Sequence, residues 1–387
     1  LATLLAGCGQ PGAPMPSLVA ASSLASASVD STGLYKATLA SLDANHNGAV
    51  EASEARGSWL EADFMSFDRN RDGHLDDQEF ARAFGGNGVK ADGIGWGVGT
   101  LIGGVVVSAA MGAYLTYAGL KGSNMIMHPD KDTFQKTPDA YGDPYQRVTF
   151  KSFDGLTLVG WYVPAATKTD KGILLLHGHG SDKDKAFLKY GQWLHQKYNL
   201  FVYDQRYCGE SQGTCMTLGD YETKDALIAL DQLRSRGNTS LGVMGESLGG
   251  AVAIDVAAQS PDIKAVVEDC AFDSMHDAVA PRAKLQHYPF SDLVADAVVE
   301  AMKFRFHTDL TQADPIKWVA KIAPRPLLVI HGLADDETTP MNGQKLFAAA
   351  QDPKQAWWVP GAKHAESWKV QPDEYKKRVF AVFDQAL

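Results

Sequence analysis

Apolar runs separated by polar, turn-forming residues dominate the chain from about residue 145 onward. The first two runs, 146–152 and 157–163, flank Asp154-Gly155, a combination that predicts an antiparallel hairpin. Six further runs predict buried, mostly parallel strands: GILLLH (172–177), NLFVYD (199–204), SLGVMGE (240–246), IKAVVED (263–269), PLLVIH (326–331) and QAWWVP (355–360). Helical stretches such as 221–236 and 248–259 fall between them. This alternation predicts a doubly wound α/β sheet over 145–387, with a ligand site at the carboxyl ends of the strands.

A second apolar segment has a different character. Residues 93–120 carry no charge, and as a helix they would extend roughly 42 Å, enough to cross a bilayer. Gly95, Gly99 and Gly103 repeat every four residues, a pattern typical of closely packed membrane helices. A buried core helix and a hairpin that dips into the membrane are the alternatives. We expect a Gly-rich transmembrane-like helix over 92–120.

The N-terminal 32 residues contain a motif and a tether. The first eight, LATLLAGC, resemble the end of a bacterial lipoprotein signal, in which the cysteine, here Cys8, becomes lipidated. An ordinary Ala/Leu-rich segment is the alternative. Residues 9–32 are rich in Gly, Pro, Ala and Ser, which is typical of a flexible tether. The segment 1–32 therefore predicts a lipid anchor on a bacterial membrane.

An internal repeat lies between 33 and 85. DANHNGAVEASE (43–54) and DRNRDGHLDDQE (68–79) both fit the calcium-loop pattern of an EF-hand, with a glycine at position 6 for the sharp turn. The apolar Val50 and Leu75 occupy the position that usually pairs two such loops. The side-chain oxygens expected to hold Ca²⁺ belong to Asp43, Asn45, Asn47 and Glu54 in the first loop, and to Asp68, Asn70, Asp72 and Glu79 in the second. Only 13 residues separate the loops, fewer than two full helices need.

Charge and cysteine content narrow the possible partners. A net charge of −10 without any basic stripe argues against a nucleic-acid partner. The four cysteines form no metal-type CxxC pair. Cys208 and Cys215 are close enough in sequence to bridge in an oxidising compartment, and the sequence leaves that question open.

The stretch GESLGG suggests a nucleophile. Ser247 follows a predicted strand, precedes a predicted helix and is flanked by small residues, as in the strand-to-helix elbow that exposes a catalytic serine. A carboxylate at Asp335 or Asp336 and then His364 follow in the order Ser, acid, His, which is the order this fold uses. We favour Asp335, because the strand before it fixes where its loop starts. The backbone N–H groups of His179 and Leu248 would form the oxyanion hole.

These motifs together resemble the Bem46-like serine hydrolases of the α/β-hydrolase superfamily. The shared landmarks are DGLTLVGWYVP, HGHGSDK, YDQRYCGESQG, GESLGG, EDCAF, RPLLVIHG and GAKHAES. The resemblance implies an α/β-hydrolase fold with a helical lid, placed at about 272–325, and ester or thioester hydrolysis without a catalytic cofactor. One extra residue in HGLADDETTP departs from the family's spacing.

The sequence therefore predicts a membrane-associated serine hydrolase with a calcium-binding module, acting on a small or lipid-like acyl ester. A serine peptidase of the same fold and a catalytically silent, calcium-responsive binding protein are the alternatives. The side of the membrane on which the hydrolase domain lies is left open.

Overall fold

The computed structural model describes residues 42–55, 64, 68, 70–76, 79, 95–131, 136–306 and 310–387, with the backbone alone described for 95–107. One compact unit contains Tyr114–Leu387, and a second contains Pro11–Ala113. The expected lipidation site, Cys8, and the expected tether lie outside the described residues.

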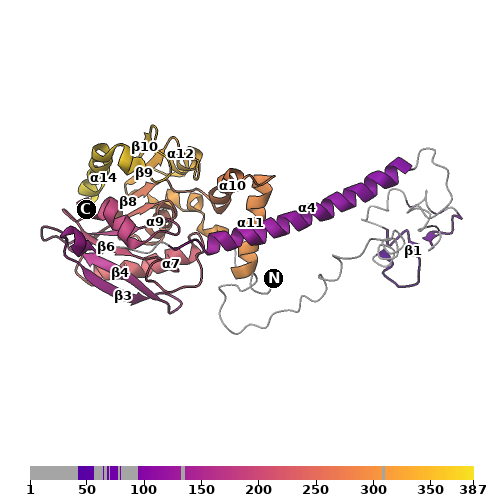
Figure 1. Ribbon diagram of the computed structural model, residues 1–387, viewed down its shortest axis with the longest axis horizontal. Helices are drawn as coiled ribbons and strands as arrows, with labels where there is room; N and C mark the ends of the chain where they lie inside the picture. The colour runs from indigo at the N-terminus through magenta and orange to yellow at the C-terminus, as the bar shows by residue number, and fades with distance from the viewer. Residues whose placement is uncertain are drawn as a thin grey trace. The chain divides into compact units, whose positions relative to one another are not determined.

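An eight-stranded sheet forms the centre of the larger unit (Figure 1). The strand order is β10-β9-β8-β7-β5-β6-β4-β3. Six strands run parallel, while β4 pairs antiparallel with both β6 and β3. The strands are β3 (Gln146–Lys151), β4 (Thr157–Val163), β5 (Lys171–Leu176), β6 (Asn199–Tyr203), β7 (Ser240–Glu246), β8 (Ile263–Asp269), β9 (Leu327–Gly332) and β10 (Lys354–Val359). All eight match predicted runs, and the predicted hairpin turns at Gly155, whose φ is +86°.

Helices cover both faces of this sheet (Figure 1). Neighbouring residues of β7 show why the strands are continuously apolar: Val243 packs in the core on one face and Met244 in the core on the other. The first face carries α7 (Asp220–Ala229), α8 (Asp231–Arg234), α9 (Leu248–Gln259) and α12 (Pro340–Ala349). The second face carries α5 (Lys183–Ala186), η3 (Phe187–Gly191), α6 (Gln192–Leu194), α13 (Ser367–Val370) and α14 (Pro372–Ala386).

A helical layer is inserted between β8 and β9, in the segment where a lid is predicted. It consists of α10 (Met275–Leu285) and α11 (Ser291–Phe306), followed by three 3-10 turns, Leu310–Ala313, Pro315–Lys317 and Val319–Ile322. Their apolar side chains, including Met275, Val298 and Met302, are continuous with the core on the α9 face.

The C-terminal end of α4 (Gly95–Met127) packs against α11 (Figure 1). The two helices approach so closely that a Cβ added at Gly119 would lie 2.6 Å from the carbonyl oxygen of Ala297, and one at Gly122 would lie 2.6 Å from Val298. The hydroxyl of Tyr114 donates a hydrogen bond of 2.8 Å to the Pro289 carbonyl. The larger unit therefore begins at Tyr114, earlier than the boundary at 145 that the sequence pattern predicts.

Among the residues that the structure describes, no helix combines the length and the apolar character needed to cross a membrane. The prediction of a transmembrane-like helix over 92–120 is therefore not supported. The segment is helical, but it continues through Lys121 to Met127, and its last turns are used to pack Ala118 and Gly119 into the larger unit.

In the smaller unit, two short strands join the two repeat loops. Strand β1 (Val50–Glu51) pairs antiparallel with β2 (His74–Leu75), and Val50 lies directly opposite Leu75. Both of these side chains are buried. The expected pairing through the apolar position of each loop is thus present.

Candidate active site

Ser247 lies at a sharp turn between β7 and α9. Its φ of 55° and ψ of −119° are unusual for a residue other than glycine, and such strain is common at functional sites. The small neighbours are required: a Cβ at Gly245 would lie 2.0 Å from the carbonyl oxygen of Gly249, and one at Gly249 would lie 2.3 Å from that of Leu176. The N–H of Ser247 donates a 2.7 Å hydrogen bond to the Asp269 carbonyl, which holds the turn against β8.

His364 follows β10 and connects Ser247 to an acid. Its Nε2 lies 3.0 Å from Ser247 Oγ, and its Nδ1 lies 2.8 Å from Asp335 Oδ2. The carboxylate accepts a hydrogen bond from Nδ1–H, so that Nε2 is left as the acceptor for the serine hydroxyl. The structure therefore brings together three residues predicted from their order in the chain, Ser247, Asp335 and His364.

The loop after β9 distinguishes the two candidate acids. Asp335 is buried, and its Oδ1 accepts hydrogen bonds of 3.0 Å from the backbone N–H groups of Glu337 and Thr338. Asp336 is exposed, and among the described residues the carboxylate that is hydrogen-bonded to His364 is that of Asp335, not that of Asp336. The geometry favours Asp335.

A second histidine, His331, touches the same carboxylate and was not predicted. It is fully buried at the end of β9, with Nε2 2.7 Å from the Thr338 carbonyl and 3.5 Å from Asp335 Oδ2. Burial alone would raise the pKa of Asp335, but the hydrogen bonds of His331 and His364 outweigh it and hold that pKa well below the usual carboxyl value. The only sequence signal that could have indicated His331 is its position at the end of the strand that precedes Asp335.

The glycine-rich loop after β5 lies beside the serine. Gly178 is so close that a Cβ added there would lie 3.5 Å from Ser247 Cβ. The next residue, His179, donates from Nε2 to the backbone carbonyl of Ile126, at 2.7 Å, near the end of α4. Burial lowers the pKa of His179 to about 4, with a further contribution from Arg282, so its ring is neutral near pH 7. The end of α4 thus holds the loop whose N–H is expected in the oxyanion hole.

Leu248, the other expected oxyanion donor, is the first residue of α9. The N–H groups of a first helical turn have no partner within the helix and face developing negative charge favourably. Its position directly after Ser247 is the one that this role requires.

Two free thiols lie in the core, and one of them is near the triad. Cys208 and Cys270 are both free and buried, so the Cys208–Cys215 bridge that the sequence left open is not formed. Cys270 contributes to a group, with Asp335 and His364, whose ligand-type atoms lie within 4.8 Å of one another. The carboxylate and imidazole of that group are already hydrogen-bonded to each other.

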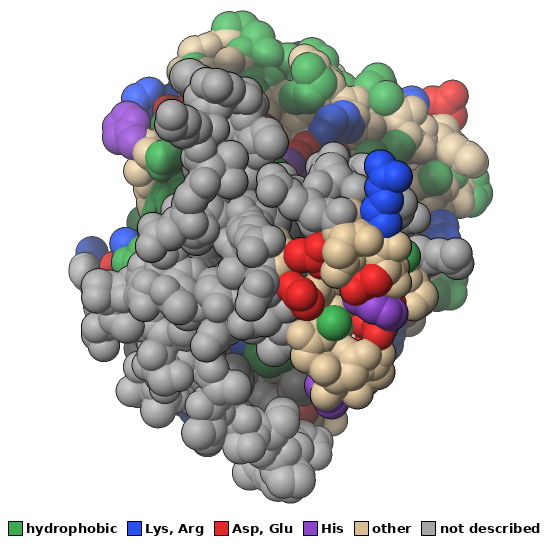
Figure 2. Space-filling model, turned by 90° about the vertical axis from the view of Figure 1, so that its right-hand side faces the viewer, with side chains coloured by type: hydrophobic (Ala, Val, Ile, Leu, Met, Phe, Trp, Pro, Cys, Tyr) green, Lys and Arg blue, Asp and Glu red, His purple; other side chains and the backbone are tan. Residues whose placement is uncertain are grey.

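The repeat loops of the smaller unit gather carboxylates. In the second loop, oxygens of Asp68, Asp72 and Glu79 lie within 4.8 Å of one another. Asp68 is further fixed by the N–H groups of Asp72 and Gly73, at 3.2 and 3.0 Å. Figure 2 shows acidic side chains together on the face nearest the viewer, where the segment around β1 lies.

The first loop folds in the same way. Asp43 accepts hydrogen bonds from the N–H groups of Asn47 and Gly48, and Glu54 accepts one from Asn45. Gly48 and Gly73 have φ near +88° and +87°, which explains the glycine at position 6 of each loop. Hard oxygen donors arranged in this way fit Ca²⁺.

Comparisons with known proteins support this class of fold. Residues 167–310 match the family model described as serine aminopeptidase, S33, and residues 61–84, which contain the second loop, match an EF-hand model. The esterase Pf2001 of Pyrococcus furiosus superposes with a TM-score of 0.56 at 21% identity, covering 67% of this chain and 99% of that one. The α/β-hydrolase GrgF from Penicillium sp. sh18 superposes with a TM-score of 0.52 at 16% identity, covering 63% and 99%.

Sequence relatives cover the same region. The uncharacterized protein YfhR of Escherichia coli K12 is 28% identical over 272 residues, which is 68% of this chain and 88% of YfhR. The uncharacterized protein YqkD of Bacillus subtilis is 24% identical over 298 residues, or 71% and 96%. The chain thus has an α/β-hydrolase fold related to those of esterases and peptidases. The narrower Bem46-like assignment stays a prediction.

Proposed function

We propose that this protein is a serine hydrolase that cleaves carboxylic ester or thioester bonds, with Ser247 as nucleophile, His364 as general base and Asp335 as the orienting acid. The observation that carries the proposal is the continuous chain of hydrogen bonds from Ser247 Oγ through His364 to Asp335, at 3.0 and 2.8 Å, on a strained elbow. Such an arrangement activates the serine hydroxyl as a nucleophile for acyl transfer.

The reaction would proceed in two halves. As Ser247 Oγ attacks the acyl carbon, His364 Nε2 takes its proton, and Asp335 stabilises the resulting imidazolium. The backbone N–H groups of Leu248 and His179 would bind the oxyanion. His364 then gives its proton to the leaving alcohol or thiol, and water, activated by the same histidine, releases the acid from the serine.

The direct test is Ser247→Ala in the full chain. We expect turnover of a p-nitrophenyl ester to fall by about three orders of magnitude or more, with the thermal unfolding profile retained. Labelling by a fluorophosphonate probe should be lost at the same time. Undiminished turnover in this variant would exclude the serine mechanism.

A serine peptidase is the second candidate, because the family model matched by residues 167–310 is described by that activity. We rank the esterase first, since the segment inserted between β8 and β9 is an aromatic-rich helical layer, which suits an acyl or aryl group. Comparing acyl p-nitrophenyl esters of increasing chain length with aminoacyl p-nitroanilides on the wild-type enzyme separates the two. Preferred cleavage of the anilides would reverse the ranking.

For the smaller unit we propose calcium binding at the two loops. The paired strands β1 and β2 and the convergence of Asp68, Asp72 and Glu79 support it. Calorimetry on the full chain should show one or two sites that are lost in the double variant Glu54→Gln, Glu79→Gln. Fluorophosphonate labelling of the double variant checks that the larger unit, which carries the triad, still folds. Absence of heat on adding Ca²⁺ to wild type would refute the proposal.

We also propose that the protein is attached to a bacterial membrane through a lipid on Cys8. The LAGC motif supports it. Incorporation of labelled palmitate in a bacterial host should be lost in Cys8→Ser and kept in Cys208→Ser. Equal incorporation in both variants would refute the anchor.

A further inference from the structure

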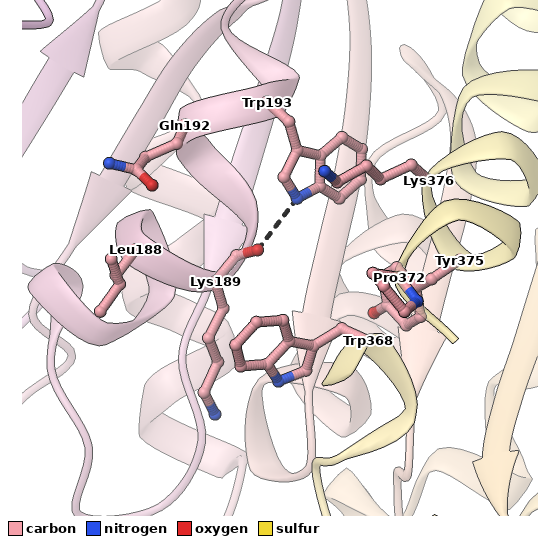
Figure 3. Close-up of a pocket in the computed structure, with 8 residues that line it drawn as sticks. All are labelled: Leu188, Lys189, Gln192, Trp193, Trp368, Pro372, Tyr375 and Lys376. Atoms are coloured by element: carbon pink, nitrogen blue, oxygen red, sulfur yellow. Dashed lines mark hydrogen bonds between the residues drawn. The ribbon is translucent and has the colours of Figure 1, made fainter. Parts of the chain in front are cut away.

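Behind the elbow, on the face of the sheet opposite α9, lies a pocket of about 280 Å³ (Figure 3). One wall comes from η3 and α6, and the other from α13 and α14. No residue that lines it belongs to the triad or to the α10–α11 layer, so it is separate from the site where an ester would bind.

Three side chains that line the pocket bond to residues that lie next to Ser247 or His364 in the chain or hold Ser247 by a hydrogen bond. Lys189 Nζ contacts both carboxylate oxygens of Glu246, the residue before Ser247, at 2.8 Å. The Tyr375 hydroxyl donates at 2.9 Å to the side chain of Asp269, whose carbonyl holds the Ser247 N–H.

The third connection leads to the histidine. The indole N–H of Trp368 donates at 3.1 Å to the carbonyl of Ala365, the residue after His364, and Ala365 has a φ of +55°. A ligand that moved these three side chains would therefore act on both halves of the Ser–His pair.

The lining indicates what kind of ligand fits. The indole rings of Trp193 and Trp368, together with Leu188 and Pro372, present apolar and aromatic surface (Figure 3). Both indole N–H groups are already bonded, that of Trp193 to the Lys189 carbonyl, so the rings offer faces rather than donors. The volume of about 280 Å³ is just below the range of about 300–1,000 Å³ that is usual for small-molecule sites, so it suits no more than one or two fused rings.

The positive charge at the rim of the pocket indicates which polar group the ligand should carry. Lys376 lines the pocket, and within the described part of the chain no ion pair involves its ammonium group. Lys189, by contrast, is already paired with Glu246. A carboxylate seated against Lys376 would gain a charge-assisted hydrogen bond without disrupting an existing pair.

We propose that this pocket binds a small planar aromatic carboxylate and that its occupancy changes the turnover of the triad. The binding stands by itself, whereas the effect on turnover rests on the proposed hydrolase function. Because the ring of the ligand would lie against Trp368, it would weaken the hydrogen bond from that indole N–H to the carbonyl of Ala365, the residue after His364. Turnover should therefore fall while the KM for the ester stays the same.

Calorimetry on the full chain tests the binding with two probes of one shape, 2-naphthoate and the neutral 2-naphthylmethanol. Wild type should bind naphthoate at least about fivefold more tightly than the alcohol. Lys376→Met should remove this preference, while Lys377→Met, which changes an exposed neighbour outside the pocket, should keep it. Equal affinity for both probes in wild type, or an unchanged preference in Lys376→Met, would overturn the site.

Steady-state kinetics tests the coupling. Saturating naphthoate should lower kcat for a p-nitrophenyl ester at least about twofold without raising KM, and Lys376→Met should be insensitive. Competitive inhibition would mean that naphthoate occupies the substrate site, and unchanged kcat would mean that the pocket is uncoupled. Either result would overturn the coupling. If wild type proves to have no ester activity, the calorimetric result on the pocket is unaffected, because Ser247 does not contribute to it.

Discussion

At the scale of single residues, the two neighbouring aspartates after β9 should contribute very differently to catalysis. Asp335→Asn would leave His364 with an amide in place of the carboxylate that now orients Nδ1, and should lower turnover by about 10³–10⁴. Asp336→Asn changes an exposed side chain and should stay within about twofold of wild type. Both are measured on one ester, and the reverse ranking would move the acid to Asp336.

Glu268 predicts a pH dependence of stability. It is fully buried on β8, and burial raises its pKa to about 8, although nearby His331 opposes the shift. Between the unfolded value of 4.5 and about 8, the folded state holds a proton that the unfolded state has lost. Stability therefore falls as pH rises across this window, by about 1.4 kcal/mol per pH unit from this group.

Glu268→Gln removes that contribution. Its stability relative to wild type should increase as pH rises from about 5 to about 7. The free energy of unfolding of the variant minus that of wild type, measured by urea unfolding, should therefore become more positive. Asp269, whose pKa burial raises to about 7, is kept in the variant and contributes to the pH dependence of both proteins. If the free energies of unfolding of variant and wild type changed with pH in parallel, the raised pKa of Glu268 would be contradicted.

The sequence indicated Ser247 and His364 because each has a local signal: Ser247 lies in a strand-to-helix elbow, and His364 follows the end of a strand. It could not choose firmly between Asp335 and Asp336, since one inserted residue shifts the spacing and only burial separates them. It missed His331, and it gave no hint that the Ile126 carbonyl binds His179, because that contact joins residues 53 positions apart.

At the scale of elements, the close contact between α4 and α11 depends on Gly119. A Cβ there would meet the Ala297 backbone, which cannot move aside as a side chain can. Gly119→Ala should therefore destabilise the larger unit by about 1–3 kcal/mol.

Gly112 in the same helix provides the matched control. Nothing lies within 4 Å of a Cβ placed there, so Gly112→Ala should be neutral or should stabilise by up to about 1 kcal/mol through helix propensity. Urea unfolding followed by tryptophan fluorescence measures both. Equal effects of the two changes would mean that α4 does not pack on α11 in solution.

The strands were predicted well because burial on both faces requires continuous apolar runs, which leave a clear trace in sequence. The uncharged run 93–120 was harder to interpret. Small residues such as Gly119 and Ala118 allow close helix packing in a membrane, but they equally allow α4 to approach α11 within a folded domain. Composition alone does not distinguish these two environments.

At the scale of the whole molecule, the end of α4 decides where the hydrolase unit begins. A chain that starts at residue 145 has every strand of the eight-stranded sheet and all three triad residues, but it lacks the Ile126 carbonyl that binds His179. It also lacks the Met127 carbonyl, which accepts a 2.8 Å hydrogen bond from the Met216 N–H, and the surface that covers α11.

We therefore expect two truncated forms to differ. The form 114–387 should hydrolyse a p-nitrophenyl ester at a rate within about threefold of the full chain, because every contact of the α4 end is kept. The form 145–387 should have a lower unfolding temperature and should lose turnover by about tenfold or more, since the loop that carries His179 is no longer held and apolar surface of α11 is exposed. Fluorophosphonate labelling measures whether Ser247 is still reactive in each form. Equal activity of the two forms would show that the α4 end is an accessory element, and the hydrolase unit would then begin at the boundary that the apolar runs alone predict.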